Sequence, residues 1–265
     1  MQSKSDIQRL LTIMERLRDP QTGCPWDKAQ SYQTIVPFTL EEAFEVADTI
    51  ERGALDELPG ELGDLLFQVI FYCQLGKEQG RFDFEQVVEK ICTKLTERHP
   101  HVFGEMSQAS SESVRETWES IKAKERAGRS LHSVLDDIPR ALPALTRAAK
   151  VQRRVATVGF DWNDLGPVVA KIHEEIDEVM VEVAAQNSDK MEDELGDLLF
   201  AVVNLARHLK LDPEQALRRA TNKFEHRFRG VEALAAQADK PMQAHTLEEL
   251  DAYWEQVKRN DPLKG

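Results

Sequence analysis

The sequence has few cysteines. Among 265 residues there are three, Cys24, Cys73 and Cys92, and no two of them form a CxxC pair. Small secreted domains depend on even sets of paired cysteines, so this composition argues against a disulfide scaffold and favours a reducing cytoplasm. We interpret the three thiols as packing residues.

Long apolar runs are also missing. The most apolar stretch, Leu65 to Leu75, spans 11 residues and is interrupted by Gln68, whereas a membrane-spanning helix needs about 20 apolar residues. The first residues, MQSKSDIQRLL, contain no signal-peptide core. We therefore expect a soluble, cytoplasmic protein without a membrane partner.

Neither strand patterns nor an excess of basic residues is present. Alternation of apolar and polar residues is essentially absent, which predicts an all-α protein. The chain has 34 Lys and Arg against 47 Asp and Glu, a net charge of -13. Because this charge repels a polyanion, we expect no nucleic-acid partner. If a protein this acidic binds phosphate compounds, it must bind them through a metal ion and a few local cations.

What the sequence does contain is an internal duplication. The earlier copy has EEAFEV at 41–46 and ELGDLLF at 61–67, and the later copy has EEIDEV at 174–179 and ELGDLLF at 194–200. In both copies the first glutamate precedes the glutamate of ELGDLLF by 20 positions. The repeat predicts two related domains, 1–126 and 144–265, joined by a linker over 127–143.

Apolar periodicity predicts the helices of both halves. Those of the first half cover 5–18, 39–51, 55–76 and 83–98. Those of the second half cover 144–156, a stretch from Pro167 to a break near 187–188, the stretch after that break, and a helix from Pro213 onward behind Asp212 as N-cap.

Three local features carry further predictions. Thr39 and Glu42 have the spacing of a capping box, which is a structural explanation for Glu42. Residues 104–113 have the composition of a mobile loop. Trp26 and Trp162 lie in loops that echo each other, GCPWD and GFDW, and we expect both rings to fill the core.

Carboxylates are spaced to meet on neighbouring helices. Glu175 and Glu178 lie three residues apart on one helix face, and Glu194 and Asp197 repeat that spacing on the next helix. If the two helices are antiparallel, the four groups converge. Four carboxylates without imidazole or thiolate indicate a hard cation, which we predict to be Mg2+. The first half repeats the set as Glu42, Glu45, Glu61 and Asp64.

Cations and aromatic residues follow the carboxylates in the same order in both halves. The first half has Lys94 with Arg98 and then Trp118 with Lys122; the second half has Lys223 with Arg227 and then Trp254 with Lys258. Each pattern alone is common on exposed helices. Together they supply what a nucleoside triphosphate requires: metal ligands, cations for the outer phosphates and an aromatic face for the base.

The order EExxE, ExxD, KxxxR resembles that of the MazG-type nucleoside triphosphate pyrophosphohydrolases, and the tandem arrangement is similar to the two-domain bacterial MazG proteins. The resemblance spans nearly the whole chain, including the GCPWD loop. It implies an all-α fold whose dimers build four-helix bundles. It also implies Mg2+-dependent hydrolysis of NTPs or dNTPs to the monophosphate and pyrophosphate.

The resemblance also implies roles for individual residues. The metal-binding carboxylates are Glu175, Glu178, Glu194 and Asp197. The nucleotide-binding residues are Lys190, Lys223, Arg227, Trp254 and Lys258. We add Glu174 as a water-activating or orienting group and Lys171 as a phosphate ligand. Lys171 and Lys190 correspond to Phe38 and Glu57 in the first half, so we expect the second half to hold the better-equipped site.

Three alternative functions compete with this interpretation, and the sequence argues against the first two. A di-metal oxidoreductase in a helix bundle requires Glu-x-x-His, and none of the 7 histidines has a glutamate three residues before it. A non-catalytic acidic interaction module with a structural metal has no use for the ordered cations. A pyrophosphohydrolase restricted to one modified nucleotide also fits, because the sequence reveals no pocket that recognises a base.

Overall fold

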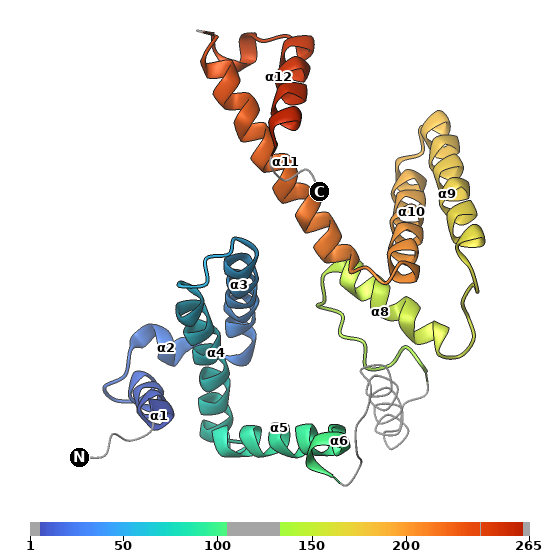
Figure 1. Cartoon of the computed structure of the whole chain (residues 1–265). Coiled ribbons are helices and arrows are strands. Elements are labelled where there is room, and N and C mark those ends of the chain that lie inside the picture. The colour runs from blue at the N-terminus through green and yellow to red at the C-terminus, as the bar shows by residue number, and fades with distance from the viewer. Residues whose placement is uncertain (1–5, 105–132, 239, 262–265) are drawn as a thin grey trace. The chain divides into compact units, whose positions relative to one another are not determined.

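The computed structural model describes residues 6–104, 133–238 and 240–261. Within these ranges every regular element is helical, which confirms the all-α prediction. The ranges contain no helix with the length and apolar character needed to cross a membrane. Contacts divide the chain into two compact units, Met1–Gly128 and Arg129–Gly265 (Figure 1).

Several sequence predictions fall outside the described ranges. These are most of the loop over 104–113 and the pair Trp118 and Lys122. The linker predicted over 127–143 lies partly outside them as well, and its limits stay a prediction.

The first unit is organised around a helical hairpin. Helix α3 (Tyr32–Glu51) packs along α4 (Leu58–Glu78), and α1 (Asp6–Leu17) packs against α4. The remaining helices of this unit are α2 (Pro25–Ala29), α5 (Phe84–Arg98) and α6 (Pro100–Phe103). Its core consists of apolar side chains from α1, α3 and α4: Met14, Ile35, Ile70, Phe71 and Leu75.

The predicted start of α3 at residue 39 is wrong, because the helix begins at Tyr32 and continues through Pro37. Its N-cap is Ser31, which forms a capping box with Thr34. Thr39 therefore caps nothing: its hydroxyl donates to the Ile35 carbonyl oxygen at 3.1 Å. Glu42 is then a mid-helix residue that has no capping role.

The second unit repeats the hairpin. Helix α9 (Leu165–Ala185) packs along α10 (Ser188–His208), and α8 (Ala144–Ala156) packs against α10. Helix α11 (Pro213–Ala236) then pairs with α12 (Leu247–Asn260), which follows the short 3-10 turn η1 (Met242–Ala244) (Figure 1). The range of α8 and the start of α11 behind the Asp212 cap are confirmed.

The turn between α9 and α10 explains the predicted break near 187–188. Gln186 adopts a left-handed conformation with φ 55°, and the side chain of Asn187 then caps α10 by accepting from the Lys190 amide. At the other end, α9 starts at Leu165 behind Asp164, two residues before the predicted start. Pro167 lies inside the first turn, where proline is tolerated because its missing N–H has no intrahelical partner.

Candidate functional site

The carboxylates of the second hairpin converge as the spacing predicted. Glu175 of α9 and Glu194 and Asp197 of α10 each place one oxygen within 4.8 Å of the others. Glu175 is 4% exposed. Glu178 follows one turn later on α9, and its pKa is raised by desolvation and then by repulsion from Glu175 and Glu194. Three of the four predicted carboxylates, Glu175, Glu194 and Asp197, therefore form one negative cluster, and Glu178 lies near enough to be repelled by it.

Lys171 lies over this cluster. Its Nζ is 2.7 Å from Glu175 Oε1 and 2.8 Å from Glu174 Oε1. Hydrogen bonds to the two carboxylates raise the pKa of Lys171, so the ammonium stays charged at neutral pH. The second oxygen of Glu175, Oε2, is buried and has no hydrogen-bond partner among the described residues. Glu174 is exposed and reaches the cluster through Lys171.

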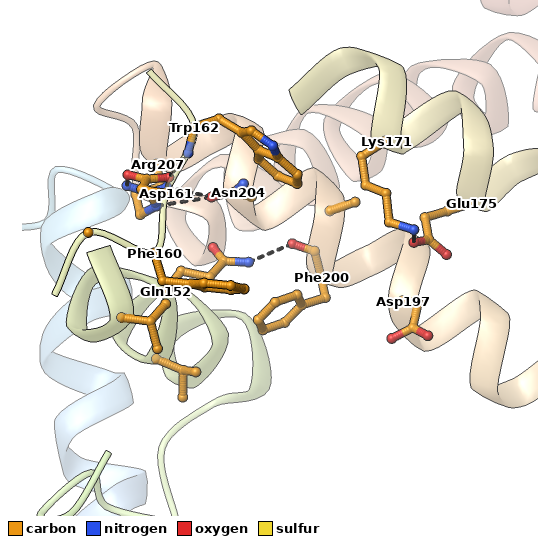
Figure 2. A pocket seen from close by; sticks show the side chains of 14 residues that line it. Gln152, Phe160, Asp161, Trp162, Lys171, Glu175, Asp197, Phe200, Asn204 and Arg207 are labelled. Atoms are coloured by element: carbon orange, nitrogen blue, oxygen red, sulfur yellow. Dashed lines mark hydrogen bonds and ion pairs between the residues drawn. The ribbon is translucent and has the colours of Figure 1, made fainter. Parts of the chain in front are cut away.

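A pocket of about 700 Å³ begins at these charged groups (Figure 2). Lys171, Glu175 and Asp197 line one end of it, and the other end is aromatic and apolar. The apolar end is formed by residues of α8, α10 and the loop before α9: Val151, Val155, Phe160, Trp162, Phe200 and Ala201. A volume in this range suits a small molecule with a flat ring, and the carboxylate end suits an anionic tail that is bound through a cation.

An ion pair holds the aromatic loop against α10. Arg207 Nη1 donates to Asp161 Oδ2 at 2.8 Å, and Arg207 Nη2 donates to the other oxygen of the same carboxylate. The hydrogen bonds from Arg207 lower the pKa of Asp161, and His208 adds a smaller effect. Because the pair is bidentate, it fixes the direction of the loop that carries Phe160 and Trp162.

The two loop tryptophans are not core residues, so that prediction is wrong. Trp26 is 51% exposed and Trp162 is 43% exposed. Trp162 lines the pocket. The similarity of the loops GCPWD and GFDW identified the segment, but the neighbouring Pro or Asp does not indicate whether the tryptophan is buried or lines a pocket.

Three polar residues that line the pocket, Gln152, Asn204 and Arg207, were not predicted from the sequence.

The other predicted nucleotide ligands lie elsewhere in the second unit. Lys190 is 3.6 Å from Glu182 near the hairpin turn, and Lys223 is exposed on α11. Arg227 pairs with Asp261 at 2.7 Å. Trp254 packs on Phe224 with ring centroids 5.1 Å apart, and Lys258 pairs with Glu255 at 2.7 Å. Lys190, Lys223, Arg227, Trp254 and Lys258 do not line the pocket, and their roles stay predictions.

The first unit has a similar carboxylate cluster but different surroundings. Oxygens of Glu42, Glu45 and Glu61 lie within 4.8 Å of one another. Desolvation, followed by repulsion from Asp64, raises the pKa of Glu42. Phe38 occupies the position of Lys171, and Trp26 packs edge-on against it with ring centroids 5.6 Å apart. An aromatic contact thus replaces the lysine that contacts the carboxylates in the second unit.

The MazG nucleotide pyrophosphohydrolase domain matches this chain twice, at residues 30–103 and 167–231. The chain belongs to the MazG family. The two matches contain both carboxylate hairpins almost completely, so the tandem repeat is confirmed. Helix α8, the loop with Phe160 and Trp162, and helix α12 lie outside the matched ranges.

Curated relatives extend the similarity to nearly the full length. A nucleoside triphosphate pyrophosphohydrolase of Escherichia coli is 56% identical over 97% of this chain and 98% of its own length. A nucleoside triphosphate pyrophosphohydrolase/pyrophosphatase MazG of Thermotoga maritima is 41% identical over 96% of both chains. A nucleoside triphosphate pyrophosphohydrolase of Mycobacterium tuberculosis is 34% identical over 57% of this chain and 45% of its own length. The family places the chain among hydrolases that act on phosphoric anhydrides.

The ion pair behind the aromatic loop generates a stability prediction. Asp161→Asn removes a charge-assisted, bidentate partner of Arg207 and should lower the free energy of unfolding by about 1–2 kcal/mol near neutral pH. Because the folded-state pKa lies below the ordinary 3.8, this contribution is complete above that value and is lost as the pH falls through the lowered pKa.

Calorimetric unfolding of both proteins between about pH 3 and pH 7 measures the difference, which should shrink toward the acid end. Glu255→Gln is the control, because it breaks an exposed pair with Lys258 and should change stability by less than about 0.5 kcal/mol. Equal stabilities of wild type and Asp161→Asn at neutral pH would contradict the role given to the ion pair.

Proposed function

We propose that the second unit hydrolyses nucleoside triphosphates, NTP or dNTP, to the monophosphate and pyrophosphate. The observation that carries the proposal is one pocket with carboxylates and Lys171 at one end and aromatic side chains at the other. The charged end suits the triphosphate and the aromatic end suits the base. The printed names of the Escherichia coli and Thermotoga maritima relatives support the same reaction.

The carboxylate cluster fits Mg2+. Its donors are all carboxylate oxygens, the ligands that this ion prefers. Glu175 Oε2 is buried without a hydrogen-bond partner among the described residues, as expected of an oxygen that is completed by a cation. Glu175, Glu178, Glu194 and Asp197 would hold the ion. When bound, it supplies Lewis-acid polarisation of the phosphate and a more acidic water.

Lys171 and Glu174 then have distinct tasks. Lys171 is close enough to the carboxylates to neutralise part of their charge, and its ammonium can move to a phosphate oxygen when the triphosphate binds. Glu174 is exposed beside it, and we assign to it the orientation or deprotonation of the attacking water. Attack at the α-phosphorus breaks the α–β anhydride bond and releases pyrophosphate, whose charge Lys171 stabilises.

Phosphorus NMR of ATP and dNTPs incubated with the protein and Mg2+ tests the reaction. The expected products are the monophosphate and pyrophosphate, because the nucleophile attacks the α-phosphorus. Orthophosphate with a diphosphate would place the attack at the γ-phosphorus and contradict the proposal. Unchanged triphosphates would favour the non-catalytic interaction module instead.

We infer further that the second unit carries most of the activity. Phe38 stands in place of Lys171 and Glu57 stands in place of Lys190, so the first cluster lacks the lysine that contacts the carboxylates of the second. Glu57 is itself bound to Arg52 at 2.9 Å. Glu42, Glu45, Glu61 and Asp64 still offer carboxylate oxygens to a metal ion.

Matched substitutions in the two hairpins separate the sites. Glu178→Ala and Asp197→Ala should lower kcat by about 100-fold or more, because each removes a ligand of the reacting centre. The equivalent changes Glu45→Ala and Asp64→Ala should reduce kcat by less than about two-fold. Steady-state release of pyrophosphate measures both pairs, and the reverse pattern would assign catalysis to the first unit.

We also propose that two copies of the chain associate through α9 and α10. Apolar side chains more than 40% exposed recur on each helix at a spacing of four and then three residues: Ile176, Met180 and Val183 on α9, and Leu195, Leu199 and Val202 on α10. This spacing forms one stripe along each helix. Two such hairpins facing each other make a four-helix bundle.

Light scattering during gel filtration tests the association. The expected mass is about twice the chain mass of 30.2 kDa. Leu199→Glu should shift the protein to monomer, because it buries a charge in the stripe, whereas Val181→Glu on the other side of α9 should leave the mass unchanged. A monomeric wild type would contradict the proposed association.

A further inference from the structure

The aromatic end of the pocket contains a buried polar side chain, Gln152, that none of the roles above explains. Gln152 of α8 is 5% exposed and lies among the aromatic residues Phe160, Trp162 and Phe200, away from Lys171, Glu175 and Asp197 (Figure 2). A buried amide in apolar surroundings is unfavourable unless its donors and acceptor are both satisfied.

The orientation of this amide is fixed by the backbone. Gln152 Nε2 donates to the Phe200 carbonyl oxygen at 2.8 Å. A carbonyl oxygen only accepts hydrogen bonds, so the amino group of the amide must face Phe200 and the oxygen must face the other way. Gln152 Oε1 is buried and accepts no hydrogen bond from any residue that the structure describes.

A neighbouring amide has its orientation fixed in the same manner. Asn204 Oδ1 accepts from Arg207 Nε at 3.0 Å and from Arg207 Nη2 at 2.7 Å. Arg207 is in turn held by Asp161. Two amides at the aromatic end thus have defined donor and acceptor directions before any ligand enters, and such preorganised polar groups provide specificity in an otherwise apolar pocket.

We propose that Gln152 Oε1 accepts a hydrogen bond from an N–H group of the nucleobase and thereby determines which bases the second unit accepts. The inference rests on the proposed function, because it takes the pocket to hold the base of the triphosphate. The ligand class is a nucleotide whose base carries an amino or imide N–H on the edge that enters the pocket. A base without that N–H leaves a buried acceptor unpaired, which binding energy from stacking does not offset.

The comparison of ATP with purine riboside triphosphate, which lacks the 6-amino group, tests the proposal. In the wild type, kcat/KM for ATP should exceed that for the analogue by about ten-fold or more, the usual effect of an unpaired buried acceptor. Gln152→Met keeps the volume and removes the acceptor, so the ratio should fall to near one. A purely structural role would lower both values and leave the ratio unchanged.

Gln68→Met is the matched control. Gln68 of the first unit is also buried, and its Oε1 likewise has no partner among the described residues, but it does not line this pocket. Its substitution should leave the ratio at the wild-type value. A wild-type ratio near one, a ratio retained in Gln152→Met, or an equal fall in Gln68→Met would overturn the proposal.

The ratio of the binding affinities for the two bases tests the role of Gln152 independently of whether the protein hydrolyses triphosphates. Affinities for the α,β-methylene analogues of the two triphosphates, measured by calorimetry, should differ by about ten-fold in the wild type and by little in Gln152→Met. If no triphosphate is hydrolysed, the proposed function fails and these affinities still decide the role of Gln152. If both triphosphates are hydrolysed equally and bound equally, the role of Gln152 fails and the function stands.

Discussion

Mutual repulsion of carboxylates between α9 and α10 is the constraint on which the second unit depends. Two full charges no more than 4.8 Å apart repel by about 3 kcal/mol or more at an effective dielectric constant of about 20. One member, Glu175, is almost fully buried, so water cannot screen it. Lys171 offsets part of this repulsion, and a divalent cation would offset the rest. The hairpin therefore keeps its negative groups together at a cost that a bound cation would offset.

The rest of the unit positions a second surface beside that charge. Helix α8 and the loop before α9 add the aromatic end of the pocket, and the pair of Asp161 with Arg207 fixes the loop. The pocket thus has carboxylates and a lysine at one end and uncharged aromatic rings at the other. In the first unit the contact of Trp26 with Phe38 replaces this arrangement. Duplication of the hairpin preserved the carboxylates, while the surroundings diverged.

The carboxylate helices were predictable because the pattern that identifies them lies between residues close together in the sequence. Glu175 and Glu178, and likewise Glu194 and Asp197, are spaced by one helical turn, and the exact repeat of ELGDLLF aligned the two halves. Local rules misled where the chain tolerates an exception: Pro37 stands inside α3, and Pro167 stands two residues after the start of α9. Proline marks a helix start only statistically, and the real caps were Ser31 and Asp164.

The aromatic end of the pocket was not predictable from the sequence, because it depends on contacts between distant residues. Asp161 and Arg207 are 46 positions apart and Gln152 and Phe200 are 48 apart, and neither pair belongs to a periodic pattern. The exposure of Trp162 likewise follows from how the loop is held against α10. Sequence spacing therefore located the charged half of the site, and tertiary packing determines the half that would hold the base.

The most direct test of the central claim is pulsed EPR of the protein with Mn2+, as a substitute for Mg2+, and a non-hydrolysable triphosphate. If the carboxylates of α9 and α10 hold the cation at which the triphosphate binds, the bound manganese should show hyperfine coupling to phosphorus, and Glu175→Gln should abolish that signal. Manganese bound without phosphorus coupling, or coupling that survives Glu175→Gln, would contradict the account.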